Sequence, residues 1–161
     1  MAQVIAMRTA QTLGLLGLLP FFALALLAWL PETATIGAVP APRFVQLALA
    51  GYTAAILSFL GAVHWGFALA DEAMPAALQR RSLSWGVVPS LLGWTALLLL
   101  ILGAAAWLVF ALLIVDLWLV RLMDGALLRL RPAPGEDYLA LRTRLTVGAT
   151  LALAIALVGS I

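Results

Sequence analysis

The fold of this chain is decided by residues 44–70, FVQLALAGYTAAILSFLGAVHWGFALA. These 27 residues contain no acidic or basic side chain, yet they include the only histidine of the protein, His64, followed by Trp65. A run of roughly 18 or more apolar residues predicts a membrane-spanning helix. An ionisable group inside such a helix is a candidate functional residue by default. The stretch therefore predicts a transmembrane helix with His64 as a candidate functional residue.

The composition extends this prediction to the whole chain. Of the 161 residues, 65% are hydrophobic and 10% are charged, with a mean hydropathy of +1.14. Soluble domains have about 45–50% apolar and about 25% charged residues. The apolar surplus must face lipid, so we expect an integral membrane protein. The absence of cysteine excludes disulfides, thiolate catalysis and cysteine-ligated metal sites. The arginines flank apolar segments, where membrane topology explains them, so nucleic acid is not an expected partner.

The apolar segments predict five helices. Residues 83–122 form a nearly unbroken apolar run that would be about 60 Å long as one helix, twice the hydrocarbon thickness, so we expect two helices with a turn at Gly103. The first apolar run could also be a cleaved signal peptide, but its length and the lack of a nearby cleavage site favour a retained helix. The prediction is an all-α five-helix transmembrane bundle in one membrane domain, 1–161, with helices at about 12–30, 44–70, 83–102, 104–122 and 138–161.

The arginines predict the orientation of this bundle. Five crossings put the two termini on opposite sides of the membrane. Eight arginines fall on the side of the N-terminus, and Arg43 stands alone on the other side. The eight are Arg8, Arg80, Arg81, Arg121, Arg129, Arg131, Arg142 and Arg144. Cytoplasmic loops carry an excess of Lys and Arg, so the N-terminus is predicted inside and the C-terminus outside.

The predicted topology gathers the polar intramembrane side chains in the cytoplasmic half. His64 and Asp116 would lie at nearly the same depth, with His64 about 9 Å from the inner face. A charged side chain deep in a helix costs about 2.5–3.5 kcal/mol, so Asp116 should contact His64 or Arg144. Such a contact could fasten two helices together or could serve in a proton relay or ligand site. The candidate ligand-binding residues are Ser58, His64, Trp65, Trp85, Ser90, Asp116 and Arg144.

A stripe of small residues marks one face of the second helix as a packing surface. Its members fall within about 100° on a helical wheel, and small residues let helix backbones approach closely. The helix-packing residues are Gly51, Ala54, Ser58, Gly61 and Ala62. One histidine and one buried aspartate are too few ligands for a metal site. An axial haem ligand at His64 is a weak alternative, so no cofactor is predicted.

Three segments resemble a known family. The strings GYTAAILSFLGAVHWGFAL (51–69), SWGVVPSLLGW (84–94) and YLALRTRLT (138–146) are similar to the transmembrane protein 69 family of bacteria and mitochondria, whose shared domain has no known function. The resemblance implies a multi-span protein of the bacterial inner membrane and no known activity. The motif positions that it implies are His64, Trp65, Trp85, Pro89, Ser90, Tyr138 and Arg142. The chain departs from the family pattern at Asp137, where a tryptophan is expected.

Three functions remain open. The first is binding of a hydrophobic small molecule or lipid in a cavity between helices, with His64 and Asp116 at its polar end. The layout is also similar to that of the tryptophan-rich sensory proteins, which bind porphyrins and sterol-like lipids, an analogy of architecture only. The second is an accessory or assembly role in a larger membrane complex, with the glycine-rich face contacting a protein partner or a second copy. The third is proton-coupled transport, and nothing indicates an enzyme.

Overall fold

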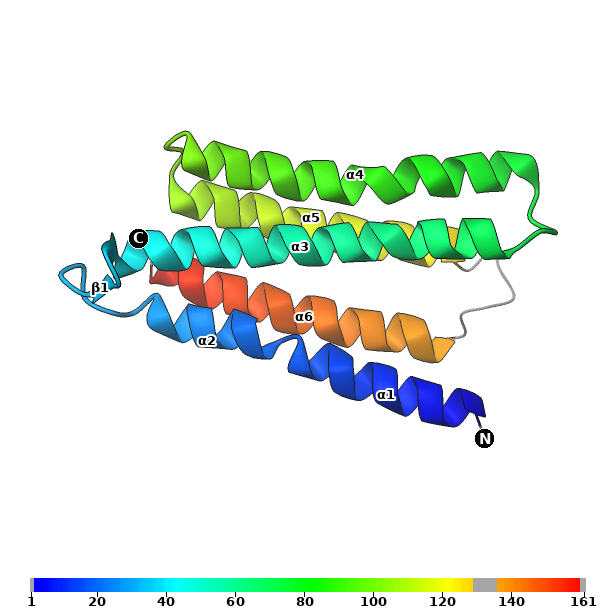
Figure 1. Ribbon diagram of the computed structural model, residues 1–161, viewed down its shortest axis with the longest axis horizontal. Helices are drawn as coiled ribbons and strands as arrows, with labels where there is room; N and C mark the ends of the chain where they lie inside the picture. Colours follow the sequence, from blue (N-terminus) through cyan, green and yellow to red (C-terminus); the bar gives the residue numbers. More distant parts are fainter. Residues whose placement is uncertain (1, 129–135, 160–161) are drawn as a thin grey trace.

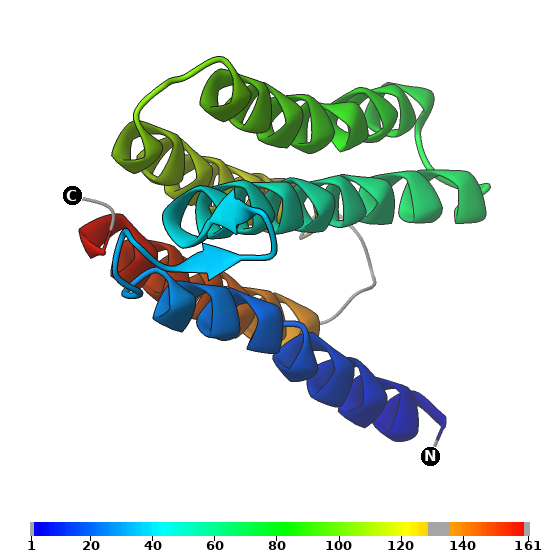
Figure 2. The same cartoon turned by 60° about the vertical axis from the view of Figure 1, so that its left-hand side comes forward.

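The computed structural model of the protein describes residues 2–128 and 136–159. It is a helical bundle, as predicted, with one short hairpin. The helices are α1 (Ala2–Leu16), α2 (Leu19–Leu27), α3 (Ala41–Ala70), α4 (Ala76–Ile101), α5 (Ala106–Leu128) and α6 (Glu136–Val158). The strands β1 (Thr35–Ile36) and β2 (Val39–Pro40) pair antiparallel in the connection between α2 and α3 (Figure 2). This hairpin turns at Gly37, whose φ of 63° favours glycine.

Five segments of the described residues are long and apolar enough to cross a membrane, because α1 and α2 together make one crossing. Helix α3 lies in the middle of the bundle, with α4 and α5 on one side and α1, α2 and α6 on the other (Figure 1). Its side chains Leu49 and Leu57 join Phe110 and Leu113 of α5 and Leu153 of α6 in the hydrophobic core. The predicted all-α transmembrane bundle is confirmed.

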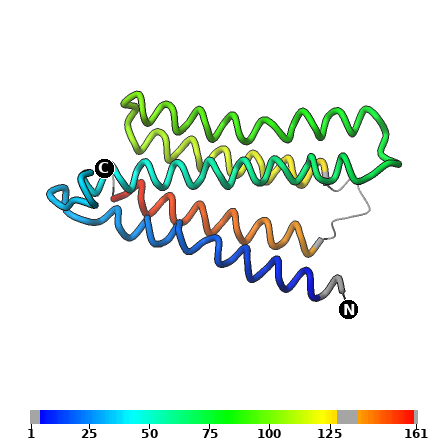
Figure 3. The backbone as a smooth tube through the Cα atoms, viewed as in Figure 1, coloured from blue at the N-terminus to red at the C-terminus, as the bar shows by residue number. Residues whose placement is uncertain are grey.

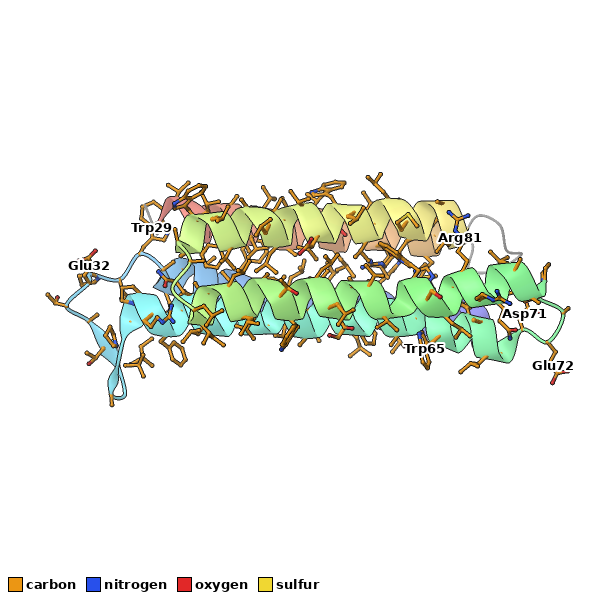
Figure 4. All side chains as sticks on the ribbon, turned by 90° about the horizontal axis from the view of Figure 1, so that it is seen from above. Trp29, Glu32, Trp65, Asp71, Glu72 and Arg81 are labelled. Carbon is orange, nitrogen blue, oxygen red and sulfur yellow. The ribbon has the colours of Figure 1, made fainter. Side chains whose placement is uncertain are left out.

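The bundle has two chemically different ends. Figure 4 shows Asp71, Glu72 and Arg81 at the end where α3 finishes and α4 begins, and Trp29 and Glu32 at the opposite end. We call the first the arginine-rich end, because Arg8, Arg80, Arg81, Arg142 and Arg144 all belong to the helix termini that meet there. Helix α1 begins at this end and α6 finishes at the opposite one, beside the hairpin (Figure 1). Arg129 and Arg131 lie outside the described residues.

Several helix ends differ from the predicted bounds. Helix α4 begins at Ala76, seven residues before the predicted start at 83. Arg80 and Arg81 therefore lie within this helix and not before it. Helix α5 continues to Leu128, six residues beyond the predicted end at 122, and α1 begins ten residues before the predicted start at 12. The predicted turn between α4 and α5 is at Gly103, where φ is +96°. Polar residues near helix ends therefore extend the helices rather than end them.

The first crossing is broken between α1 and α2. Pro20 follows the break and has no N–H to donate, so the usual helical hydrogen-bond ladder cannot continue through it. Tyr52 of α3 compensates, because its hydroxyl donates a 2.9 Å hydrogen bond to the carbonyl oxygen of Gly17. The Tyr52 ring also packs edge-on against Phe21, with centroids 5.0 Å apart. The break is therefore built into the bundle and held from α3.

Helices α3 and α4 approach closely along part of the predicted small-residue stripe. A Cβ added to Gly61 would overlap the carbonyl oxygen of Gly86, and one added to Gly93 would lie 2.8 Å from Cα of Ala54. A Cβ at Gly51 would meet open space instead. Ser58 and Ala62 are exposed on the surface of the bundle. Gly61 and Ala54 thus lie in the α3–α4 contact, whereas Gly51, Ser58 and Ala62 lie outside its tightest part.

Candidate functional site

Three ionisable side chains from three helices meet near the arginine-rich end. His64 of α3 donates from Nε2 to Asp124 Oδ1 of α5 at 2.9 Å. Arg142 of α6 donates to the other carboxylate oxygen, Oδ2, from Nε at 2.9 Å and from Nη2 at 2.6 Å. Because a carboxylate only accepts hydrogen bonds, Nε2 of His64 carries the proton. Both oxygens of Asp124 are thus used, and its carboxylate links α3 to α6.

This cluster is almost completely buried. The side chain of His64 is 0% exposed, that of Asp124 4% and that of Arg142 5%. Taking charges out of water is costly unless they are paired and hydrogen-bonded. Asp124 and Arg142 meet this condition, since their opposite charges are in direct contact. The cluster therefore joins α3, α5 and α6, and the contact between the three helices requires all three side chains.

The structure corrects the predicted partner of His64. Asp116 was predicted to contact His64 or Arg144, but the carboxylate that His64 reaches is Asp124. Asp124 had been assigned to a polar connection, because the predicted fourth helix ended at 122. Asp116 is 9% exposed and makes no hydrogen bond with the described residues, and Arg144 is exposed on α6. Continuation of α5 through Gly125 is what brings Asp124 into the bundle.

Four buried polar atoms of the described residues have no hydrogen-bond partner: Nδ1 of His64, Nε1 of Trp85, and Oγ1 of Thr146 and Thr150. Buried polar groups are normally paired, because an unpaired one costs about 1–3 kcal/mol. His64 belongs to the buried cluster, and Thr146 lies four residues after Arg142 on α6. Their unpaired atoms indicate where a further polar group would be stabilised.

A cavity of about 480 Å³ lies between α1, α3 and α6. We call it the α1–α6 cavity. Its walls are almost entirely apolar. They comprise Ala10, Leu13, Gly14, Gly17, Leu18, Phe21, Ile56, Phe59, Leu60, Val63, Leu117, Tyr138, Leu141, Arg142, Leu145, Thr146 and Ala149. Ligand sites in proteins are typically pockets of about 300–1,000 Å³ with apolar walls and a few polar groups.

The polar groups of the cavity are concentrated on one face of α6. Tyr138, Arg142 and Thr146 follow one another at a spacing of four residues, so their side chains lie above one another along the helix. Arg142 belongs to the cavity and to the buried cluster at once. Its Nε and Nη2 are bonded to Asp124, and its Nη1 makes no hydrogen bond with the described residues. Thr146 also lines the cavity, and its hydroxyl, which has almost no accessible surface, lacks a partner among the described residues.

The predicted ligand-binding residues do not converge on this cavity. None of the seven is among its walls. Ser58 and Trp65 are exposed, and their polar atoms bond to the helix carbonyls of Ala54 and Leu83. Ser90 likewise donates to the carbonyl of Val87 within α4. His64 is connected to the cavity only through Asp124 and Arg142.

The predicted ligand-binding residues did not include Asp124, Tyr138, Arg142 or Thr146. For two of them a signal existed, because Tyr138 and Arg142 are motif positions implied by the family resemblance. Their spacing of four residues would have placed them on one helix face. Among the described residues, no group of three or more His, Cys, Asp or Glu side chains has the arrangement of a metal site.

Comparison with known proteins identifies the family of the chain. A family model described as a protein of unknown function (DUF3429) matches residues 6–158. Transmembrane protein 69 of Xenopus tropicalis is 39% identical over 162 aligned residues, covering 96% of this chain and 56% of the frog protein. Transmembrane protein 69 of Mus musculus is 36% identical over 91 residues, covering 56% of this chain and 34% of the mouse protein. The chain thus spans about half of the frog relative's length, and no solved structure matches it. The family model covers nearly the whole chain, so the resemblance to the transmembrane protein 69 family is confirmed. This multi-pass membrane protein belongs to the DUF3429 family, whose function is unknown.

Proposed function

We propose that the protein binds one hydrophobic molecule, a lipid or another amphiphile, in the α1–α6 cavity. The observation that carries this proposal is an apolar cavity of about 480 Å³ whose wall includes Thr146, a residue whose buried hydroxyl has no partner among the described residues. An empty apolar cavity needs no polar group. Rotation of the Thr146 side chain toward a bound molecule would give its hydroxyl the partner that it lacks.

The shape of the cavity favours an elongated ligand. Its wall on α6 extends from Tyr138 to Ala149, eleven residues or about 16 Å along the helix axis. Tyr138 and Arg142 lie toward the arginine-rich end, and the walls become purely apolar beyond Thr146. A molecule with a polar head near Arg142 and a hydrocarbon body along Leu145 and Ala149 matches this gradient.

A lateral entrance fits the same kind of ligand. Toward its first residues α1 diverges from α3 while it stays beside α6 (Figure 3). Leu13 on α1 and Phe59 on α3 both line the cavity and are 63% and 67% exposed. The first crossing is also the least buried of the five, with 11% of its most apolar stretch inside the bundle. A lipid chain could therefore enter from the bilayer between α1 and α3.

The buried cluster has a positioning role in this proposal. Asp124 fixes the guanidinium of Arg142 through two hydrogen bonds, and His64 fixes Asp124 in turn. The polar end of the site is thus Tyr138, Arg142 and Thr146, in place of the His64 and Asp116 end first expected. His64 acts on the ligand only through the orientation of Arg142.

Native mass spectrometry of protein purified in mild detergent tests the proposal. We expect wild type to carry one small molecule per chain. Val63→Phe should lose it, because Val63 lines the cavity and the larger ring fills it. The matched control is Ala62→Phe, one position along α3 on the exposed surface, which should keep it. Thr146→Val, which keeps the side-chain shape but not the hydroxyl, should weaken retention. An empty wild type, or equal retention in the two phenylalanine variants, would refute the proposal.

The other hypotheses gain less support. The glycine-rich face of α3 does not favour an accessory role, because α4 of the same chain packs on Gly61 and Ala54. Proton-coupled transport stays a prediction, and loss of flux in Asp116→Asn proteoliposomes would be its signature. No observation favours bound haem.

We infer that the arginine-rich end faces the cytoplasm of a bacterial inner membrane, on the basis of the arginine distribution. The natural lack of cysteine makes this easy to test. Ala38→Cys in the hairpin turn, at an exposed position without a positive φ, should react with a membrane-impermeant maleimide on intact cells that lack an outer-membrane barrier. Ala73→Cys, exposed between α3 and α4, should react only after the membrane is opened. The reverse labelling pattern would overturn the orientation.

A further inference from the structure

A second hollow, of about 510 Å³, lies on the outer face of α5 and α6 and shares no residue with the α1–α6 cavity. It is lined by Trp118, Arg121, Leu122, Gly125, Ala126 and Thr143. It is more open than that cavity, and one of its lining side chains, Arg121, is cationic. No step of the proposed function uses it.

Arg121 is held in this hollow by the neighbouring helix. Its Nε donates a 2.8 Å hydrogen bond to Oγ1 of Thr143 on α6. The Thr143 hydroxyl gives its own proton to the carbonyl oxygen of Leu139 at 2.9 Å, so its lone pairs face the guanidinium. A Cβ at Gly125 would lie 3.2 Å from Nη1, hence the glycine leaves room for the side chain. The hydrogen bond to Thr143 therefore fixes the orientation of the Arg121 guanidinium.

The charge of Arg121 has no counter-ion within the described part of the chain. The carboxylate nearest in the sequence on the same side, Asp124, already pairs with Arg142 and His64, and Arg121 forms no ion pair with any described residue. Neither Nη group forms a hydrogen bond with a described residue, so both could bind an anion. A cation in a membrane helix normally finds a partner, because leaving it unpaired is costly. Here the partner must come from outside the described residues.

The depth of Arg121 points to the class of that partner. Arg121 lies seven residues before the end of α5, about 10 Å along the helix, on the arginine-rich end. This is the level at which long basic side chains reach lipid head groups. The planar guanidinium matches the oxygens of a phosphate, with two parallel hydrogen bonds. Trp118, one turn away and 37% exposed, suits the same interface.

We propose that this hollow binds the phosphate group of an acidic phospholipid through Arg121, with Thr143 as the residue that orients the guanidinium. Basic pockets between transmembrane helices on the cytoplasmic side bind such head groups in the same way. The site is independent of the proposed cavity ligand, because no side chain is shared.

The test is lipid titration followed by native mass spectrometry, with phosphatidylglycerol and phosphatidylcholine as the two probes. Wild type should retain phosphatidylglycerol in preference to phosphatidylcholine. Arg121→Gln should lose this preference, with about tenfold weaker retention of phosphatidylglycerol, the loss expected for one charge-assisted contact. The control is Arg81→Gln, the same charge change at an exposed residue on the same end, which should behave like wild type.

Further arms separate the site from general charge and from folding. Thr143→Val keeps every charge, so weaker phosphatidylglycerol retention in this variant supports a site oriented by Thr143. A thermal midpoint of Arg121→Gln near that of wild type shows that the loss is not unfolding. Displacement of the lipid by millimolar inorganic phosphate would assign the site to free phosphate and overturn the lipid assignment. Equal losses in Arg121→Gln and Arg81→Gln would reduce the effect to net charge and also overturn it.

Discussion

Replacing Asp124 by asparagine is the sharpest test of the buried cluster. The substitution preserves the size of the side chain but removes its charge. In the native cluster the carboxylate accepts three hydrogen bonds, one from His64 and two from Arg142. An asparagine has one acceptor oxygen in place of two, so at least one donor loses its partner. The guanidinium of Arg142, 5% exposed, is left as an unneutralised buried charge.

The expected loss of stability is large for a single substitution. Removing one partner of a buried ion pair costs about 3–5 kcal/mol. Hydrogen bonds to charged groups contribute about 1.5–3 kcal/mol each, so losing one or two of them leads to the same range. Because the asparagine oxygen still accepts one hydrogen bond, we expect the lower end, about 3 kcal/mol. For a chain of this length that corresponds to a fall in the thermal midpoint of about 6–12 °C.

Thermal unfolding in a fixed detergent, followed by circular dichroism, measures this effect. The matched control is Asp116→Asn, the same chemical change on the same helix at a carboxylate without a hydrogen bond to the described residues. It should shift the midpoint far less. The double variant Asp124→Asn with Arg142→Gln removes both charges, so it should be less destabilised than the sum of the two single variants.

Two results would refute the reasoning. If Asp124→Asn is no less stable than Asp116→Asn, the cluster does not fasten the helices. If the double variant loses as much as the sum of the single variants, Asp124 and Arg142 are not energetically coupled, whatever their distance.

Two further predictions follow from the packing of α3. Gly61→Ala should lower the thermal midpoint by several degrees, because its Cβ would overlap the carbonyl oxygen of Gly86 and overpacking costs about 1–3 kcal/mol. Gly51→Ala is the control: a Cβ there meets open space, so this variant should be neutral or slightly stabilising. Equal midpoints for the two variants would contradict the close α3–α4 approach. Tyr52→Phe removes the hydrogen bond to the Gly17 carbonyl and should cost about 1 kcal/mol, with faster hydrogen exchange around the α1–α2 break. Unchanged exchange there would show that Tyr52 does not hold the break.

The helical architecture could be predicted because lipid selects long apolar runs, and the sequence contains five of them. The division of residues 83–122 followed from length alone, and Gly103 adopts the positive φ that a tight turn between helices needs. Helix ends were harder. Residues 76–82 and 123–128 are polar enough to suggest loops, but a helix that emerges from the membrane continues into water at little cost. Hydropathy therefore does not mark the helix ends at Ala76 and Leu128.

The pairing of the site could not be read from hydropathy for the same reason. Asp116 stood out because apolar residues surround it, whereas Asp124 stood beside Gly125 in a segment that looked solvated. The two lie eight residues apart on one helix, which separates them by about 12 Å in depth and about 80° around the axis. Which of them faces His64 depends on the rotation and height of α5 relative to α3. Those two quantities are set by contacts between distant residues, such as the packing of Leu57 and Leu113 in the core.

The side chain of Arg142 takes part both in the contact that joins the helices and in the wall of the proposed ligand site. Nε and Nη2 of Arg142 bind Asp124 and tie α6 to α5, while the same side chain lines the α1–α6 cavity. If the proposed ligand is anionic or accepts hydrogen bonds, Arg142 can serve both roles only while Asp124 fixes its orientation. Asp124→Asn should then weaken ligand retention at temperatures where the variant is still folded, and Asp116→Asn should not. Retention equal to wild type in folded Asp124→Asn would separate the two roles and leave the cluster with fastening alone.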